Sequence, residues 1–242
     1  MQLELITEQE VETLKAAIRD AENIIVLGHK SPDGDALGAC LAWTEYLKQW
    51  GKTAHIIVPD AFPNFLKWLP GTDDVLRFDK QTDEVKALCQ RADLMFCLDF
   101  NDTSRLEELQ EVIALSKAKR VLIDHHLNPT IDGIVTISHP EASSTCELVF
   151  RVICQLGGFE QLTQQIAAPI YCGMMTDTGG FTYNSTRPVI YTIIGMLLTT
   201  GIDKDKIYRN VFNNYSQWAI RLRGFLMSER LCVFDEYHAA YF

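Results

Sequence analysis

Acidic and imidazole side chains follow several apolar runs of this sequence, most conspicuously in the triplet Asp124-His125-His126. The apolar run Val121–Ile123 before the triplet is typical of a buried parallel strand, so the triplet falls at the carboxyl end of that strand. Open α/β sheets bind their ligands at this end. One such triplet is weak evidence for a site, and its weight comes from similar clusters elsewhere in the chain.

Three other clusters place the same residue types at the ends of expected elements. They are His29 with Asp33 and Asp35, then Asp99, and then Asp177. Hard divalent cations such as Mn²⁺ accept carboxylate and imidazole ligands together, and Co²⁺ or Mg²⁺ tolerate similar ligands. The four carboxylates would balance the charge of two such ions. The sequence therefore predicts a site for two metal ions.

Two divalent ions about 3.5–4 Å apart can share a hydroxide that attacks phosphorus while they stabilise the attacking and leaving oxygens. A carboxylate must bridge ions this close, and Asp99, alone at its strand end, is the best candidate. Asp124 is interpreted as a residue that orients an imidazole, since metal-bound imidazoles usually donate their second proton to a carboxylate. His126 is expected to contact phosphate or to protonate a leaving oxygen.

Each cluster also has an ordinary structural explanation. An aspartate after a strand most often caps a helix, a His-His pair is more often a surface or core feature, and Asp177 could belong to a simple turn. Their joint occurrence at successive strand ends favours a site. In the first cluster, Pro32 would stiffen the loop and Gly34 would let it turn sharply, so that Asp33 and Asp35 diverge toward different ions.

The elements that would position these clusters alternate between strands and helices. Strands are expected at 24–27, 53–58, 94–98, 121–123 and 134–137, and helices at 7–20, 36–49, 62–69, 85–91 and 106–116. This alternation predicts an α/β fold with a doubly wound, mainly parallel sheet flanked by helices. After Pro140 the chain becomes a helical segment, in which Ser144–Glu147 forms a capping-box pattern, and residues 231–242 suggest a hairpin.

The composition is that of an ordinary globular protein, with 242 residues, 47% hydrophobic and 22% charged. A net charge of −10 argues against long duplex nucleic acid as a partner, because phosphate tracking needs a basic stripe. Bound cations would still allow a small anionic substrate. Seven cysteines without CxxC spacing, no leader and no membrane-spanning run predict a reduced, cytoplasmic protein with no membrane partner.

The four clusters resemble, in order, the motifs of the DHH phosphoesterase superfamily over about residues 20–230. Residues 29–36 match the first motif, Leu98-Asp99 with Asp102 and Arg105 resembles the second, Asp124–His126 is the name-giving third, and residues 176–181 resemble the fourth. Residues 142–145, Ala-Ser-Ser-Thr, also fit the branch that contains bacterial nanoRNases (oligoribonucleases) and pAp phosphatases.

The resemblance implies a Mn²⁺-dependent phosphoesterase with two ions. By position, one ion would be held by His29, Asp33 and Asp99, and the other by Asp35, Asp99, His125 and Asp177. His126 would face the phosphate and would act with Asp99 and Asp124. The residues expected around this centre or against the substrate are Arg105, Asp102, Ser143, Ser144 and Thr178, with Arg105 bracing Asp99 or Asp102.

Members of this branch continue into a smaller C-terminal domain, whose Gly-Gly-Gly-His stretch grips the substrate, and the present sequence lacks that stretch. The resemblance therefore implies a catalytic domain over 1–230, with an α/β core over about 1–140 and a helical part over about 141–230. Residues 231–242 would begin a substrate-binding domain that is mostly absent, as in a truncated chain.

The favoured function is hydrolysis of short oligonucleotides (nanoRNA) or of 3'-phosphoadenosine 5'-phosphate. An inorganic pyrophosphatase shares the four-motif core and is a second hypothesis. A cyclic dinucleotide is a further possible substrate. A non-catalytic nucleotide-binding regulatory module is a third hypothesis, although every expected metal-ligand position carries a suitable residue. The apolar helices after residue 186 fit a homodimer interface as well as a core.

Overall fold

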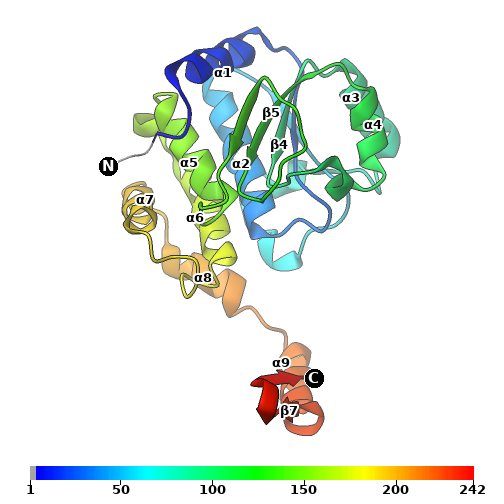
Figure 1. Ribbon diagram of the computed structural model, residues 1–242, viewed down its shortest axis with the longest axis vertical. Coiled ribbons are helices and arrows are strands. Elements are labelled where there is room, and N and C mark those ends of the chain that lie inside the picture. Colours follow the sequence, from blue (N-terminus) through cyan, green and yellow to red (C-terminus); the bar gives the residue numbers. More distant parts are fainter. Residues whose placement is uncertain (1–3) are drawn as a thin grey trace.

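A computed structural model of the chain describes residues 4–242 (Figure 1). Its centre is a six-stranded sheet in the order β3-β2-β1-β4-β5-β6, and every pairing in it is parallel. The strands are β1 (Ile24–Leu27), β2 (Ala54–Val58), β3 (Leu76–Arg77), β4 (Leu94–Leu98), β5 (Lys119–Asp124) and β6 (Val135–Ser138). The predicted α/β class and doubly wound parallel sheet are confirmed.

Helices cover both faces of this sheet (Figure 1). One face carries α3 (Thr82–Arg91) and α4 (Leu109–Leu115), and the other carries α1 (Glu8–Asp20), α2 (Gly34–Gln49), α5 (Thr145–Gln155) and α6 (Gln164–Asp177). Successive residues of a strand point to opposite faces, and accordingly Val26 and Leu27 of β1 belong to different core clusters. Burial on both faces explains why the central strands β1 and β4 are apolar throughout rather than alternating.

Several helix boundaries differ from the sequence-based expectation. The helix expected over 106–116 is a 3₁₀ turn, Thr103–Leu106, followed by the shorter α4, and the helix expected over 62–69 is only the 3₁₀ turn Asn64–Leu66. The first helix begins as expected, because Thr7 and Glu10 form a reciprocal capping box. The edge strand β3 was not predicted, since two residues give no readable pattern.

Glycines let α2, α5 and α6 approach closely beneath the carboxyl ends of the strands. A Cβ on Gly173 would clash with Cys146 Sγ and would lie 2.8 Å from Asp35 Oδ1. Gly34 was expected to bend the loop, but it is the first residue of α2. A Cβ on Gly34 would clash with the Thr176 side chain. The expectation for Gly34 is therefore wrong, and the residue serves close helix packing instead.

The C-terminal part contains α7 (Pro188–Leu198), α8 (Lys204–Phe212), α9 (Gln217–Phe225), a π-helical turn (Leu226–Arg230) and the antiparallel pair β7 (Cys232–Phe234) and β8 (Ala239–Tyr241). The hairpin expected over 231–242 is thus present. Nearly every residue after Asn213 is exposed, and this segment lies apart from the sheet in Figure 1. Among residues 4–242, no helix has the length and apolar character needed to cross a membrane.

Replacing Gly173 by Ala should destabilise the fold by about 1–3 kcal/mol, because the added methyl group has no room between α2, α5 and α6. Urea-induced unfolding of the metal-free protein measures this loss. The matched control is Gly195→Ala in α7, where no heavy atom lies within 4 Å of the added Cβ. That control should be neutral or gain up to about 1 kcal/mol from helix propensity. Equal stability of the two variants would contradict the packing argument.

Candidate metal centre

The predicted ligands converge at the carboxyl ends of β1, β4 and β5, where the sheet order reverses direction between β1 and β4. His29 follows β1, Asp99 follows β4, and the Asp124–His126 triplet ends β5. Asp35 lies in the first turn of α2. Asp177 was expected at the end of an element in the helical part of the chain, and it is the last residue of helix α6. Helix α6 brings its carboxylate to the same place as the strand-end residues.

Three groups of donor atoms each lie close enough together, within 4.8 Å, to hold a metal ion. They are His29, Asp33 and Asp99; Asp35, His125 and Asp177; and Asp99, His125 and His126. The first group is the same as the first ion site implied by the resemblance. The second group is the other implied ion site without Asp99, which the resemblance assigns to both sites. The third group, which adds His126 as a possible ligand, was not expected.

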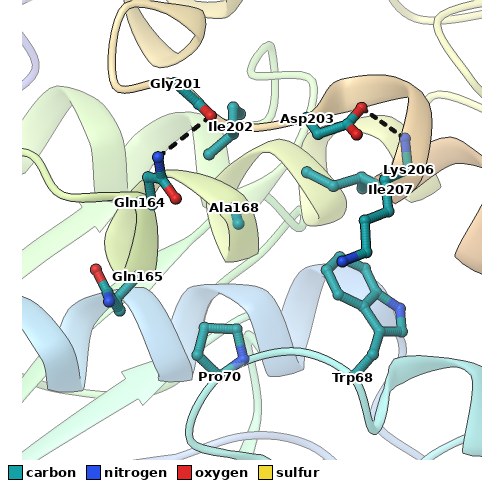
Figure 2. Close-up of a pocket in the computed structure, with 10 residues that line it drawn as sticks. All are labelled: Trp68, Pro70, Gln164, Gln165, Ala168, Gly201, Ile202, Asp203, Lys206 and Ile207. Atoms are coloured by element: carbon teal, nitrogen blue, oxygen red, sulfur yellow. Dashed lines mark hydrogen bonds between the residues drawn. The ribbon is translucent and has the colours of Figure 1, made fainter.

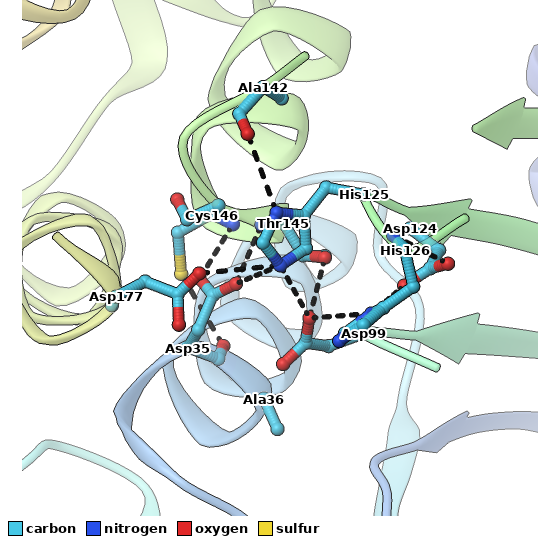
Figure 3. Close-up of polar contacts among 12 residues, drawn as sticks. Asp35, Ala36, Asp99, Asp124, His125, His126, Ala142, Thr145, Cys146 and Asp177 are labelled. Carbon is cyan, nitrogen blue, oxygen red and sulfur yellow. Dashed lines mark hydrogen bonds and ion pairs between the residues drawn. The ribbon is translucent and has the colours of Figure 1, made fainter. Parts of the chain in front are cut away.

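Asp99 lies between the first two groups and faces each with a different oxygen. Its Oδ2 is 3.5 Å from His29 Nε2, and its Oδ1 is 3.6 Å from His125 Nε2. Figure 3 shows His125 among Asp35, Asp99 and Asp177, and its Nε2 is 3.3 Å from Asp177 Oδ2. This arrangement is the one a bridging carboxylate requires.

Asp99 also has an unusual backbone conformation, with φ of 66° in the left-handed region. Few residues other than glycine adopt this region, and the cost is of order 1–3 kcal/mol. The backbone N–H of Asp99 donates to the Ile123 carbonyl at 3.1 Å, which anchors the strained residue to β5. The strain turns the chain sharply at the end of β4, at the residue whose carboxylate lies between the two groups.

The backbone contacts of His29 and His125 indicate which ring nitrogen of each is free for a metal ion. His29 Nδ1 is 2.7 Å from the Lys30 carbonyl oxygen, and His125 Nδ1 is 3.4 Å from the Ala142 carbonyl oxygen. A carbonyl only accepts, so Nδ1 carries the proton in both rings and Nε2 keeps its lone pair. Burial and the neighbouring His126 lower the pKa of His125, which favours the neutral, ligating form.

His126 has a different environment from its neighbour. Its Nδ1 is 2.7 Å from Asp124 Oδ1, and its backbone N–H donates to Asp124 Oδ2 at 3.0 Å. The hydrogen bond to Asp124 raises the pKa of His126 and favours the protonated ring. The side chain is 35% exposed, against 15% for His125. Asp124 therefore orients His126, the more accessible imidazole, rather than His125.

Burial and mutual repulsion both act on the carboxylates of this centre. Burial raises the pKa of Asp35 and of Asp99 well above the usual range, and the charges of nearby aspartates add to the effect. Burial and then the charge of Asp33 raise the pKa of Asp177 to about 6. A bound cation would reverse this penalty. The donor set, carboxylates with neutral imidazoles, fits a hard divalent cation.

The amino end of α5 holds two of these carboxylates in place. The backbone N–H groups of Thr145 and Cys146 donate to the two oxygens of Asp35 at 2.6 and 2.9 Å, and Thr145 Oγ1 donates to Asp99 Oδ1 at 2.8 Å. Free N–H groups and the helix dipole favour anions at this end. The sequence-based site did not include Thr145, although the Ser144 cap places it in the first turn of a helix.

The expected capping box at Ser144 is only half formed. Ser144 Oγ accepts from the Glu147 N–H at 3.0 Å, but the Glu147 carboxylate accepts from the N–H and Oγ of Ser143, both at 2.8 Å. Arg187 Nη2 lies 2.7 Å from both Glu147 oxygens, and Arg151 Nη1 lies 3.3 Å from one. A buried carboxylate needs such partners. Ser143 and Ser144 thus fix the start of α5.

Asp33 and Thr178 both have a role in forming the chain around the centre. Asp33 Oδ1 accepts from the N–H groups of Asp35 and Ala36 at 2.9 and 3.0 Å and caps α2, which leaves its other oxygen for the first donor group. Thr178 Oγ1 donates to the Met174 carbonyl at 2.7 Å, in the last turn of α6. The helix-cap explanation and the ligand explanation of Asp33 are therefore compatible.

Asp102 and Arg105 lie beside the centre, but they are not joined to each other as expected. Asp102 accepts from the Ser104 N–H at 2.8 Å and from Thr130 Oγ1, and these hydrogen bonds lower its pKa to about 2. No hydrogen bond or ion pair found over residues 4–242 joins the Arg105 side chain to Asp99 or Asp102, so the expected brace is not formed. Arg105 is exposed, and its charge acts to lower the pKa of His126, against the larger effect of Asp124.

Comparison with known proteins identifies relatives of this chain. The profile of the DHH family, N-terminal domain, matches residues 23–174, which is more than half of the chain. The bifunctional oligoribonuclease and PAP phosphatase NrnA of Thermus thermophilus is 32% identical over 181 residues, covering 74% of this chain and 50% of that protein. The chain thus spans about half the length of the curated relatives it matches.

Solved structures agree with this relationship. An exopolyphosphatase-related protein from Bacteroides fragilis is 45% identical, with a TM-score of 0.95 over 98% of this chain and 69% of its own. The exonuclease RecJ bound to manganese has the same fold at 16% identity, with a TM-score of 0.52 over 82% of this chain and 49% of its own. The residues matched by the family profile, 23–174, include the three strand ends that carry His29, Asp99 and the Asp124–His126 triplet. The chain belongs to the DHH family.

Proposed function

We propose that this protein is a phosphoesterase that hydrolyses short oligonucleotides, 3'-phosphoadenosine 5'-phosphate, or both, with two divalent cations. The observation that carries this proposal is the position of Asp99 between two groups of metal donors. The substrate class is supported by the relative named oligoribonuclease and PAP phosphatase, which is 32% identical. The fold alone would not support it, since one fold hosts many activities.

In this proposal, one cation would be held by His29, Asp33 and Asp99, and the other by Asp35, Asp99, His125 and Asp177. Mn²⁺ is the first choice, because the donors are carboxylates and imidazoles, and Co²⁺ or Mg²⁺ are alternatives. When bound, such ions would activate a water molecule and stabilise the charge that develops on the phosphate oxygens.

The remaining residues of the site would bind the phosphate and move a proton. Asp124 holds the His126 ring through Nδ1, which leaves Nε2 facing away from that hydrogen bond. A protonated His126 can contact the phosphate and can donate the Nε2 proton to the leaving oxygen. Arg105 adds an exposed positive charge beside His126, where a substrate phosphate would approach.

The other two functions have weaker support. An inorganic pyrophosphatase has the same four motifs, but no relative described above carries that name. A non-catalytic nucleotide-binding module would be expected to have lost ligands, and here every predicted ligand lies in a donor group. Comparing cleavage of a dinucleotide with cleavage of pyrophosphate separates the two enzymes, and nucleotide binding without any turnover in Mn²⁺ would favour the module.

The proposal also covers the domain organisation of the chain, its cellular location and its oligomeric state. Residues 1–230 would form the catalytic domain, and residues 231–242 would begin a substrate-binding domain. Seven cysteines without a disulfide support a cytoplasmic location. A homodimer would use the apolar helices after residue 186.

Replacing Asp99 by Asn should lower Mn²⁺-dependent release of mononucleotide by more than about 100-fold in the full-length natural protein. Loss of an outer partner of a metal ligand already costs about 10- to 100-fold, and a shared ligand should matter more. Metal content measured on the same samples should also fall. The control is Asp20→Asn, an exposed aspartate at the end of α1, which should keep wild-type turnover. Unchanged turnover of Asp99→Asn would refute the role of this residue.

Without metal, the protein should be less stable at pH 7 than at pH 5. The pKa of Asp177 is about 6 in the folded chain, against an ordinary value of 3.8. Between these values the folded state binds more protons than the unfolded state, so the free energy of unfolding falls as pH rises. Mn²⁺ should restore stability, and it should raise Tm more at pH 7 than at pH 5 because the ligands must be deprotonated.

Thermal unfolding at the two pH values, in chelator and in Mn²⁺, provides the measurement. Asp177→Asn removes one of the titrating carboxyl groups and should reduce the pH dependence of the metal-free protein. An equal Mn²⁺-induced rise in Tm at pH 5 and pH 7 would show that these carboxylates do not bind the ion.

A further inference from the structure

The loop that follows Asp177 is held rigidly at both ends. At its start, the N–H groups of Thr182 and Tyr183 donate to the Thr178 carbonyl oxygen at 2.9 and 3.2 Å. At its end, Arg187 binds Glu147 of α5 with both distances at 2.7 Å. The loop is therefore anchored at both ends, and it begins directly after Asp177, a member of a donor group.

Tyr183 is the exposed aromatic residue of this loop. The residue is 59% exposed, whereas Phe181 is half-buried against Tyr171, with ring centroids 5.7 Å apart. The Tyr183 ring rests against Gly179. A Cβ there would lie 3.0 Å from its Cδ1 and Cζ and would clash with its Cε1. Gly179 also has a φ of 55°, which favours glycine. The backbone at Gly179 thus packs against one side of the Tyr183 ring, while much of the residue stays exposed to solvent.

This ring lies close to a candidate metal ligand. Gly179 is two residues from Asp177, and consecutive Cα atoms are about 3.8 Å apart. The ring edge in contact with Gly179 is therefore within roughly 12 Å of the Asp177 Cα. A nucleotide whose phosphate occupied the metal centre would extend its base over a comparable distance.

The other aromatic rings at the centre are already engaged. His125 and His126 contact each other, with ring centroids 4.8 Å apart, and both make the hydrogen bonds described above. A base bound nearby would therefore need another π surface. Bases stack on exposed aromatic side chains in many single-strand binding proteins, and such stacking tolerates every base.

We propose that Tyr183 is a stacking platform for the nucleobase of the nucleotide whose phosphate lies at the metal centre. This inference rests on the proposed function and narrows it, because it makes recognition depend on a base and not only on phosphate. Stacking on one aromatic ring contributes about 1–3 kcal/mol, which corresponds to about 5- to 150-fold in affinity. Tyr183 would thus be a specificity residue that distinguishes nucleotides from pyrophosphate or sugar phosphates.

The test compares Tyr183→Ala and Tyr183→Phe with the wild type in the full-length natural protein. The substrates are a dinucleotide and the same compound with one base removed, in both possible positions. Tyr183→Ala should raise KM for the dinucleotide by about 5- to 150-fold with little change in kcat. It should leave KM unchanged for the compound that lacks the stacked base. Tyr183→Phe keeps the ring and should behave as the wild type. Tyr191→Ala, which removes an equally exposed tyrosine on α7, is the matched control.

Three results would overturn the inference: no change in KM for the dinucleotide, an equal change for both base-free compounds, or a loss in Tyr183→Phe as large as in Tyr183→Ala. If the wild type cleaves none of the compounds, the proposed hydrolysis fails, and calorimetric binding of AMP and ribose 5-phosphate decides on Tyr183. Tighter binding of AMP by the wild type, lost in Tyr183→Ala, would support stacking. Equal binding of the two ligands would exclude it.

Discussion

Mutual repulsion among buried carboxylates is the constraint on which this structure depends. Asp35 and Asp99 are almost fully buried, and Asp177 lies beside them, so the pKa of each carboxyl is raised. Folding such a cluster costs free energy unless positive charge compensates it. Part of the compensation comes from the amino end of α5, whose N–H groups bind Asp35. The rest would come from bound cations. Because the cluster is unfavourable without metal, the folded protein should favour metal binding.

The fold supplies the geometry that makes this concentration of charge possible. The strand order reverses between β1 and β4, which is where open α/β sheets bind their ligands, and the crossover helix α2 follows β1 there. Glycines at 34 and 173 remove the side chains that would keep α2, α5 and α6 apart. The left-handed backbone of Asp99 turns the chain at the same point. Backbone strain, close helix packing and charge repulsion therefore occur together at the candidate site, and little of this would benefit stability alone.

Much of the sheet and most of the metal donors could be predicted from the sequence, because both rest on local patterns. The run before Asp124 is short, apolar and followed by polar residues, which marks a buried strand end. Asp177 could be placed as well, because it directly follows an apolar run in the helical part of the chain and ends helix α6. Thr145 and the Glu147–Arg187 pair depend on contacts between distant residues, which no local pattern reveals. Arg105 lies near Asp102 through its backbone N–H, but the expected brace by its side chain is not formed.

The central claim is that Asp99 joins two metal sites, and anomalous X-ray diffraction from crystals of the Mn²⁺-loaded protein tests it most directly. The account predicts two manganese positions. Both should contact Asp99, one together with His29 and Asp33, and the other together with Asp35, His125 and Asp177. A single ion, no ion, or two ions that both avoid Asp99 would contradict it.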